Sequence, residues 1–392
     1  MKYVSVQDLV EQNQVVIKTG PFGTQLKASE YVSFGTPVLN VRNLGFATVN
    51  TDKLEMVSDG TLERLSAHKL VTGDIVFGRK GAVERHAFIS ESENGWMQGS
   101  DCIRLRVLAD SVNPRFLSYY FLTKRHRAFM MSMCSHGTTM ASLNQKIIEK
   151  IIVPLPERSI QDKVVEILAT LDKQIATNQK INENLEQQAK AIYQQMFIEN
   201  TSPDWVEGSL RDIADITMGQ SPSGSSYNED GIGVIFFQGR AEFSFRFPTI
   251  RLYTTEPKRM ACANDILMSV RAPVGDLNIA HTDCCIGRGL AAIHSKTNHQ
   301  SFVLYTMFSL RKQLDVFNGE GTVFGSINRN SLNDMPILIP SDEAIEEFER
   351  IVAPMDAAIR NNYDEICRLQ TVRDSLLPRL MSGELDVSEL DI

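Results

Sequence analysis

Residues 137–144 read GTTMASLN, and residues 321–328 read GTVFGSIN. The two stretches lie 184 residues apart, and the same offset maps Pro156 onto Pro340 and Asp172 onto Asp356. The match continues without a gap for about sixty residues. One such pairing could arise by chance, but several in the same order indicate an internal repeat.

The repeat also extends toward the beginning of each copy, where the offset changes. Residues 73–76 (GDIV) match residues 264–267 (NDIL) at an offset of 191, and residues 5–9 (SVQDL) match residues 209–213 (SLRDI) at 204. A changing offset indicates loops of unequal length between the matched segments. The chain is therefore a duplication in which each copy has a variable globular part followed by a constant tail.

Each tail predicts a long helix with an apolar seam of heptad spacing. In the first copy the seam positions are Val164, Leu168, Leu171, Ile175, Asn178, Asn182, Leu185, Ala189, Ile192 and Met196. Their equivalents run from Phe348 to Leu380 in the second copy. Residues 157–197 contain no Gly or Pro, which allows a helix of ~55 Å. In the second copy we expect Pro378 to stop or bend the helix near Leu376, and Gly383 to terminate it.

Asn178 and Asn362 occupy equivalent seam positions. If the two helices pair in antiparallel fashion, these amides should face each other and set the helix register, at some cost in stability. Alternatively, each Asn is a polar break on an exposed turn.

The globular parts read as mixed α and β. Residues 36–41, 74–77 and 102–107 are strand-like, and residues 114–131 predict an amphipathic helix whose counterpart is 301–317. The expected fold class is α+β, with two pseudo-symmetric mixed α/β globular domains separated by a pair of long antiparallel coiled-coil helices. The expected segments are domain 1 (1–156), a central helix (157–199), domain 2 (200–340), and a C-terminal helix and tail (341–392).

Composition is that of a globular protein, with 392 residues, 43% apolar and 22% charged. No apolar run approaches ~18 residues and the first residues do not resemble a signal peptide, so we expect a soluble, cytoplasmic protein. The six cysteines show no C-x-x-C spacing, which argues against a zinc module and predicts reduced, mostly buried thiols.

The net charge of −8 is unevenly distributed. Residues 1–150 contain 18 basic against 14 acidic residues, whereas residues 336–392 contain 5 against 13. A basic first part and an acidic C-terminal segment predict different partners for the two surfaces.

No pattern typical of catalysis is present. The sequence has no G-x-x-x-x-G-K-[ST] loop, no H-E-x-x-H and no G-x-S-x-G. Residues 319–325 resemble a dinucleotide loop only superficially, because the glycine spacing is wrong. We therefore predict no catalytic residue, no metal and no cofactor, which favours a binding protein.

Polar, glycine-containing loops provide the candidate binding residues. Arg and Lys can contact phosphates or guanine, Asn and Gln can bridge adenine, and glycine allows close approach of the backbone. In the first copy the candidates are Lys18, Thr19, Gln25, Lys27, Arg42, Asn43, Arg79, Lys80, Arg85, His136, Thr138 and Thr139. In the second copy they are Ser221, Ser223, Gln238, Arg240, Arg271, Arg288 and Thr322. Arg79, Lys80 and Arg85 form the strongest candidate phosphate-binding loop, although any one loop residue could simply belong to a solvated turn.

These features together resemble a known family. The chain combines GPFGTQLK (20–27), GDIVFGRKG (73–81), Leu155-Pro156 before a long helix, a duplication of this plan, and a terminal LPRLMSGEL (377–385). This arrangement resembles the DNA-specificity subunit of type I restriction-modification systems, over essentially the whole chain. The second copy departs from the pattern, with GQSPS (219–223) and SVRAP (269–273) in place of the first copy's motifs.

The resemblance implies that each globular domain is a target-recognition domain for one half of a bipartite DNA sequence. The paired helices would set the gap and dock two methyltransferase subunits, and motor-nuclease subunits would join them. The subunit itself would be non-catalytic. Because the two copies differ, the target should be asymmetric. The alternatives are a coiled-coil scaffold that organises partner proteins without reading DNA, and an enzyme with an unrecognised nuclease or methyltransferase site.

Overall fold

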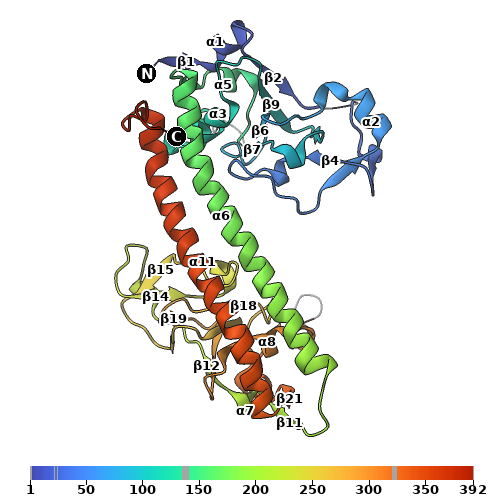
Figure 1. Ribbon diagram of the computed structural model, residues 1–392, viewed down its shortest axis with the longest axis vertical. Coiled ribbons are helices and arrows are strands. Elements are labelled where there is room, and N and C mark those ends of the chain that lie inside the picture. Colours follow the sequence, from blue (N-terminus) through green and yellow to red (C-terminus); the bar gives the residue numbers. More distant parts are fainter. Residues whose placement is uncertain (1, 22, 24, 135–140, 320–324, 392) are drawn as a thin grey trace. The chain divides into compact units, whose positions relative to one another are not determined.

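The computed structural model describes residues 2–21, 23, 25–134, 141–319 and 325–391. Two long helices run through it, α6 (Arg158–Tyr193) and α11 (Asp342–Ser382), and a six-residue π-helical turn follows α6 (Figure 1). The chain divides into unit 1, Met1–Thr177 with Glu365–Ile392, and unit 2, Asn178–Asp364. Each unit therefore contains one globular part and a stretch of both helices, whereas the sequence-based division treats each helix as a separate segment.

Unit 1 is built around a four-stranded antiparallel sheet of order β2-β9-β6-β7. A second sheet has the order β3-β5-β4-β8, with β4 and β8 parallel, and β1 pairs with β10. The strands are β1 (Tyr3–Ser5), β2 (Val15–Thr19), β3 (Tyr31–Val32), β4 (Thr36–Leu39), β5 (Glu55–Val57), β6 (Ile75–Gly78), β7 (His86–Phe88), β8 (Met97–Gln98), β9 (Cys102–Val107) and β10 (Ile152–Pro154). The shorter helices are α1 (Val6–Glu11), α2 (Asp59–Arg64), α3 (Pro114–Phe121), α4 (Lys124–Cys134) and α5 (Gln145–Glu149).

Unit 2 repeats this topology. Its main sheet has the order β12-β20-β17-β18, its second sheet β13-β15-β14-β19-β16 with β14 and β19 parallel, and β11 pairs with β21. The strands are β11 (Val206–Ser209), β12 (Ala214–Met218), β13 (Tyr227–Asn228), β14 (Val234–Phe237), β15 (Leu252–Thr254), β16 (Met260–Ala261), β17 (Ile266–Ser269), β18 (Leu277–Ile279), β19 (Cys284–Ile286), β20 (Leu290–Ser295) and β21 (Pro336–Ile339). The helices are α7 (Leu210–Ile213), α8 (Gln300–Ser309), α9 (Arg311–Leu314) and α10 (Arg329–Asn333). The predicted α+β duplication is thus confirmed.

The repeated sequence motifs have local structural reasons. Ser5 with Asp8, and Ser209 with Asp212, form capping boxes at the start of α1 and α7. Asn144 accepts a hydrogen bond from the Ile147 amide, and the equivalent Asn328 caps α10 in the same way. The motif therefore begins a short helix in each copy.

The long helices pack against each other within each unit. Residues that ascend along α6 contact residues that descend along α11. In unit 1, Val164 and Leu168 of α6 share a core with Leu377 and Leu380 of α11, while Ile175 clusters with Ile366 and Leu369. In unit 2, Tyr193 packs on Phe348, and Asn182 contacts Asn362. The seam residues of the heptad pattern are buried or half-buried. The antiparallel pairing is confirmed inside each unit.

Three local expectations are corrected. The helix does not stop at Pro378: α11 continues to Ser382, because Leu377, Leu380 and Met381 are buried in the unit 1 core. Gly383, with φ 75°, follows its end. Asn362 Nδ2 donates to Asn182 Oδ1 at 2.8 Å, so Asn182, one turn beyond Asn178, is its partner. The predicted helix 114–131 is two helices, because the Thr123 hydroxyl accepts from the His126 amide and α4 begins anew.

All six cysteines are free thiols, and four of them are buried. Helices within the described ranges lack the sustained apolar stretch that crossing a membrane requires.

Candidate nucleic-acid interface

Five segments meet at one end of the main sheet in unit 1. The Gly20 amide donates to Cys102 O at 2.8 Å, which ties the end of β2 to the start of β9. The Gly99 amide donates to the carbonyl of Leu39, the last residue of β4, at 3.0 Å. These bonds bring the segments after β2 and β4 beside the segment that leads into β9.

The remaining two segments join through Arg79. Its amide donates to Asp101 O at 2.8 Å, and its carbonyl accepts from the Leu143 amide at 2.8 Å. Lys80 also forms an isolated β-bridge with Ser142. We call the five segments loop cluster 1: residues 19–21, 40–43, 79–81, 99–101 and 141–145.

Unit 2 brings together the equivalent segments. The amides of Gln220 and Gly287 donate to Ile286 O and Phe237 O at 3.0 and 2.8 Å. The Val270 amide donates to Gly289 O at 2.9 Å, and Arg271 bridges to Ser326 as Lys80 does to Ser142. We call these segments loop cluster 2: residues 219–223, 238–240, 270–276, 287–289 and 325–327.

Glycine permits the contact between backbones in both clusters. A Cβ at Gly20 would lie 1.9 Å from Gly99 O, and a Cβ at Gly219 would lie 2.2 Å from Gly287 O. These distances exclude any side chain without movement of the backbone. The two glycine pairs therefore hold the loops at equivalent places in the repeat.

Part of the predicted binding set lies in loop cluster 1 or beside it. The Lys80 ammonium is exposed and 3.7 Å from Asp101 Oδ1. Thr19 Oγ1 accepts from Gln145 Nε2 at 3.1 Å, and Lys18 lies just before it on β2. The Arg79 side chain is half-buried. This end of the sheet therefore presents two lysines and an arginine on a backbone frame.

Other predicted residues lie outside this group or are occupied. Arg42 is exposed and forms an ion pair of 3.0 Å with Glu55. Arg85 is exposed, lies over the Phe46 ring at 5.6 Å, and is 3.9 Å from Glu84. Gln25 and Lys27 belong to the exposed segment that leads to β3, and the structure shows no contact of theirs with loop cluster 1 within the described ranges.

The prediction that Asn43 contacts DNA is wrong for this conformation. Its side chain is fully buried, and Nδ2 donates to the carbonyls of Asn50 and Asp52 at 2.9 and 3.2 Å. Its Oδ1 accepts from the Asn40 amide at 3.1 Å. Asn43 therefore holds its loop together. A sequence cannot distinguish a buried loop-bracing Asn from an exposed one, because both favour turns.

Loop cluster 2 carries two exposed arginines. Arg271 and Arg288 are exposed, and neither guanidinium has a hydrogen-bond or ion-pair partner in the part of the chain that the structure describes. The Arg288 amide donates to Ser221 Oγ at 3.2 Å. Ser223 Oγ contacts Ser225 Oγ, and Gln238 is exposed. Charged and polar groups are thus available at this end of the sheet.

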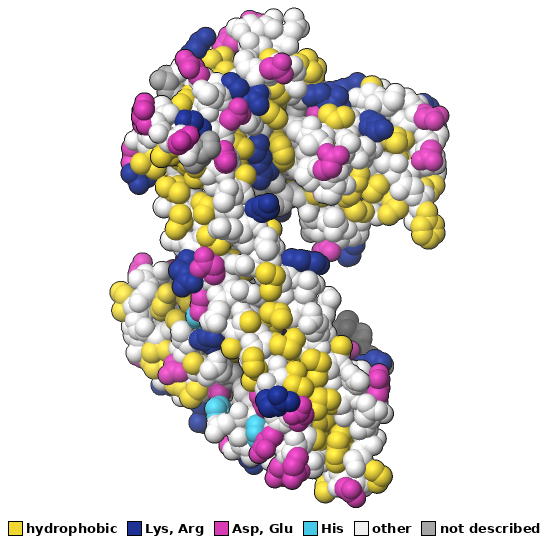
Figure 2. All heavy atoms as spheres, viewed as in Figure 1, with side chains coloured by type: hydrophobic (Ala, Val, Ile, Leu, Met, Phe, Trp, Pro, Cys, Tyr) yellow, Lys and Arg dark blue, Asp and Glu magenta, His cyan; other side chains and the backbone are white. Residues whose placement is uncertain are grey.

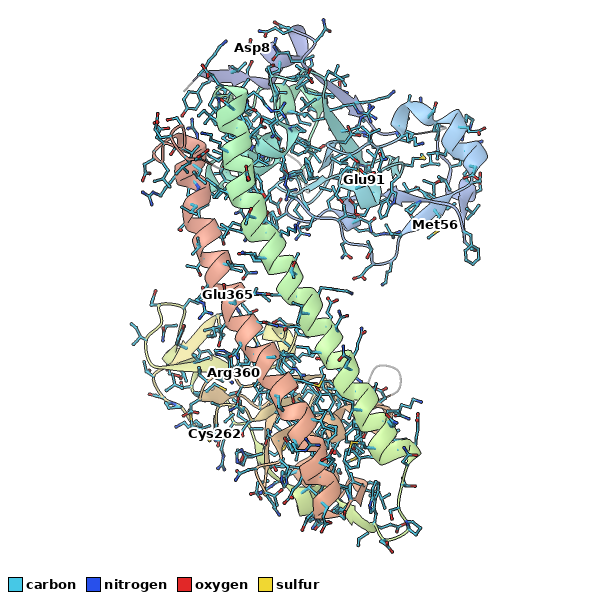
Figure 3. The ribbon with its side chains drawn as sticks, in the orientation of Figure 1. Asp8, Met56, Glu91, Cys262, Arg360 and Glu365 are labelled. Carbon is cyan, nitrogen blue, oxygen red and sulfur yellow. The ribbon has the colours of Figure 1, made fainter. Side chains whose placement is uncertain are left out.

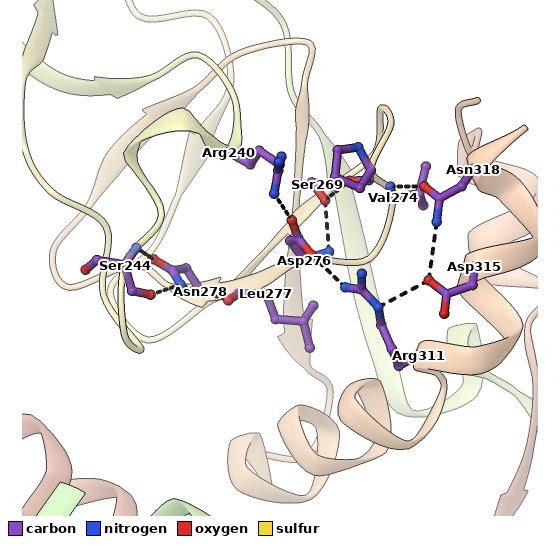
Figure 4. A network of polar contacts seen from close by, with 11 residues as sticks. Arg240, Ser244, Ser269, Val274, Asp276, Leu277, Asn278, Arg311, Asp315 and Asn318 are labelled. Carbon is purple, nitrogen blue, oxygen red and sulfur yellow. Dashed lines mark hydrogen bonds and ion pairs between the residues drawn. The ribbon is translucent and has the colours of Figure 1, made fainter. Parts of the chain in front are cut away.

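Arg240, unlike Arg271 and Arg288, takes part in a network of hydrogen bonds and ion pairs (Figure 4). Its guanidinium pairs with Asp276, whose other oxygen accepts from Arg311 Nη1 at 2.7 Å. Asn318 Oδ1 accepts from the Val274 amide in the same segment. A phosphate would have to compete with Asp276 for Arg240. These contacts hold the 270–276 segment in place.

Four predicted residues, His136, Thr138, Thr139 and Thr322, lie outside the described residues. Sequence reasoning did not single out Gln145 or Asp101, although both contact predicted residues. Position in the repeat could have found Gln145, since it directly follows the motif that ends at Asn144.

Two observations bear on the chemistry of the loop clusters in the described part of the chain. Burial raises the pKa of the Cys102 thiol, next to loop cluster 1, which favours the protonated thiol over the thiolate at neutral pH. No group of three or more His, Cys, Asp or Glu in the described ranges could hold a metal ion. On the face drawn in Figure 2, basic and acidic side chains are interspersed over both units. The loop clusters are suited to binding a partner through a few Lys and Arg side chains and amide groups.

Comparisons with known proteins identify the family of this chain. The family model described as "Type I restriction modification DNA specificity domain" matches residues 17–187 and again 203–366. The MjaX specificity subunit assigned to a type I restriction enzyme of Methanocaldococcus jannaschii is 28% identical over 97% of this chain and 93% of its own. The MjaIX specificity subunit of the same organism is 24% identical over 72% of this chain and 71% of its own.

A solved structure supports the fold. The crystal structure of the type I restriction-modification S subunit from M. genitalium matches with a TM-score of 0.61 at 13% identity, covering 97% of this chain and 96% of that one. At this level of identity the likeness concerns the fold alone.

Proposed function

Since the chain belongs to the type I restriction-modification DNA specificity family and has the role of a specificity subunit, we propose that its two loop clusters read the two halves of one bipartite DNA target. The observation that carries the proposal is the repetition of one loop framework with different side chains. Loop cluster 1 presents Arg79 and Lys80, with Lys18 beside it on β2, whereas loop cluster 2 presents Arg271 and Arg288. Equivalent frames with unlike side chains would read unlike half-sites.

In this proposal the long helices set the gap between the half-sites and dock two methyltransferase subunits, which motor-nuclease subunits join. The acidic segment 336–392 would then face protein, because like charge repels the DNA backbone. The chain would carry out no chemistry itself and would act in the cytoplasm, where host DNA is accessible.

The test is the salt dependence of DNA affinity for a chain with Arg79→Ala and Lys80→Ala. Each phosphate contact contributes about 0.9 to the slope of log affinity against log salt. We expect weaker binding and a slope reduced by about 1 to 2. The matched control is Lys173→Ala with Lys180→Ala, which removes the same charge from exposed positions of α6. Unchanged affinity and slope in the Arg79, Lys80 variant would favour a scaffold that does not read DNA.

A further inference from the structure

In each unit a buried tyrosine of the globular part donates a hydrogen bond to an acid on a long helix. Tyr119 of α3 donates to Asp172 Oδ2 of α6 at 2.7 Å. Tyr305 of α8 donates to Asp356 Oδ1 of α11 at 3.0 Å. Both tyrosines are 1% exposed, and the two acids are separated by the repeat offset of 184. The duplication has therefore retained this contact in both copies of the chain.

In unit 1 the acid lies between two arginines. Asp172 Oδ1 is 3.1 Å from Arg373 Nη1, and Asp172 Oδ2 is 3.4 Å from Arg115 Nη2. Arg373 belongs to α11 and Arg115 to α3. This group, which we call clamp 1 (Arg115, Tyr119, Asp172 and Arg373), joins the globular part to both long helices.

In unit 2 the charges are reversed, so that one arginine lies between two acids. Arg246 Nη2 is 2.7 Å from Asp356 Oδ1 of α11, and Arg246 Nε is 3.6 Å from Glu186 Oε2 of α6. The Arg246 side chain is 2% exposed. Clamp 2 (Glu186, Arg246, Tyr305 and Asp356) thus makes the same three-way connection with a different arrangement of charges.

A second bond attaches each globular part to the same helix some distance away. The Asn113 amide, at the start of α3, donates to Gln161 Oε1 of α6 at 2.8 Å. The Phe302 amide, in the first turn of α8, donates to Glu349 Oε1 of α11 at 2.8 Å. The two attachment points lie about 16 Å apart along α6 and about 10 Å apart along α11, at ~1.5 Å per residue. A globular part attached at one point could rotate on the helix, whereas attachment at two points fixes its orientation.

Buried ion pairs are a poor source of net stability, because desolvation offsets most of their attraction. Apolar residues would stabilise the same junction at least as well, but they would not select one orientation, since apolar packing lacks the directionality of a charge-assisted hydrogen bond. Resting on the proposed function, we infer that clamps 1 and 2 are positioning residues: they set the angle of each recognition domain on the long helices and thereby restrict the number of base pairs accepted between the half-sites.

The experiment uses the full chain in complex with its methyltransferase subunits. The variants Asp172→Asn and Asp356→Asn are compared with wild type on duplexes whose gap varies from two base pairs below to two above the preferred length. We expect the ratio of methylation at the preferred gap to methylation at neighbouring gaps to fall about fivefold. The base preferences inside each half-site should not change, because the loop clusters are untouched.

The effect should be larger for Asp172→Asn. Unit 2 has further attachments, since Arg360 of α11, labelled in Figure 3, donates to Asn264 Oδ1 at 2.5 Å and His281 contacts Asp364 at 2.7 Å. Glu365→Gln and Glu347→Gln are the matched controls, because within the described residues each acid pairs along α11, with Arg368 and Arg350. Tyr119→Phe and Tyr305→Phe, which remove only a hydroxyl, provide the same test if an Asn variant does not fold.

The outcomes separate the inference from the function on which it rests. A chain that was merely less stable would lose methylation at all gaps in proportion. Folded clamp variants that keep the wild-type gap profile would overturn the inference and leave the proposed function standing. A wild-type complex that is indifferent to the gap would overturn the proposed function.

Discussion

Gly20 and Gly219 allow two backbones to touch at the loop clusters. The missing Cβ, rather than an unusual backbone angle, is what matters, because Gly99 O and Gly287 O occupy the space. Gly20→Ala should lower the free energy of unfolding by about 2 kcal/mol through overpacking, and it should weaken DNA binding by displacing the 19–21 segment. Urea denaturation and a binding titration measure the two effects. Gly60→Ala in α2, where a Cβ meets nothing within 4 Å, is the control, and equal behaviour of both variants would contradict the prediction.

Two buried histidines give unit 1 a dependence on pH. His86 and His126 lie among Phe77, Phe121 and Tyr120. Burial, with a smaller contribution from neighbouring positive charge, lowers the pKa of each imidazole to about 3. Both rings are therefore neutral in the folded chain at any physiological pH.

The sign of the effect follows from proton binding. An unfolded histidine has a pKa near ~6.5, so between pH 6.5 and about 3 the unfolded chain binds protons that the folded chain does not. Stability should fall as pH falls through this window, by about 1.4 kcal/mol per pH unit for each histidine. His126→Leu should flatten the change in urea midpoint between pH 7 and pH 5. NMR of the imidazoles checks the cause directly: titration of His86 or His126 near pH 6 would refute it.

At the scale of elements, the polar break in the helix pair is the contact between Asn182 and Asn362. Asn182 is buried, and its Nδ2 also donates to Ile359 O at 3.2 Å. Asn182→Leu alone should destabilise the chain by about 1 to 3 kcal/mol, because the Asn362 amide loses its partner. The double variant with Asn362→Leu should recover most of that loss.

Thermal or urea unfolding of the four proteins in this double-mutant cycle measures the coupling. Asn184→Leu, at an exposed position of the same helix, should change stability by no more than about 0.5 kcal/mol. Additive single changes would mean that the two amides do not act as a pair.

Elements were predicted well where local pattern controls them. The strand Cys102–Val107 agrees with the expected 102–107, and α6 begins at Arg158 shortly after the expected entry at Pro156. The helix stop that was one of the two outcomes expected at Pro378 is absent, because tertiary burial overrode a local rule. Pro378 removes a helical hydrogen bond, yet burial of its neighbours on both sides of the turn keeps α11 continuous.

At the scale of the whole molecule, the two loop clusters predict an asymmetric DNA target. Mapping methylated adenines in host DNA should give two different half-sites separated by a constant gap. Arg271→Ala with Arg288→Ala should relax or change the base preference of one half-site and leave the other unchanged. A palindromic target, or a change in both halves, would contradict the assignment of one cluster to each half-site.

The sequence by itself determined the duplication, the α+β class and the two long helices, and it led us to expect their antiparallel pairing. These features depend on the spacing and order of residues along the chain, which the sequence shows directly. It also placed basic and amide residues in the loops, because Gly, Asn, Ser and Thr mark turns wherever they occur.

Only the tertiary structure decided which loops meet, that Asn43 and Arg240 are occupied while Arg271 and Arg288 have no side-chain partner among the described residues, and that Asn362 pairs with Asn182. It alone placed Tyr119 against Asp172 and Arg246 between Glu186 and Asp356. The physical reason is that hydrogen bonds between residues tens to hundreds of positions apart depend on sheet register and helix packing. Neither leaves a local pattern in the sequence.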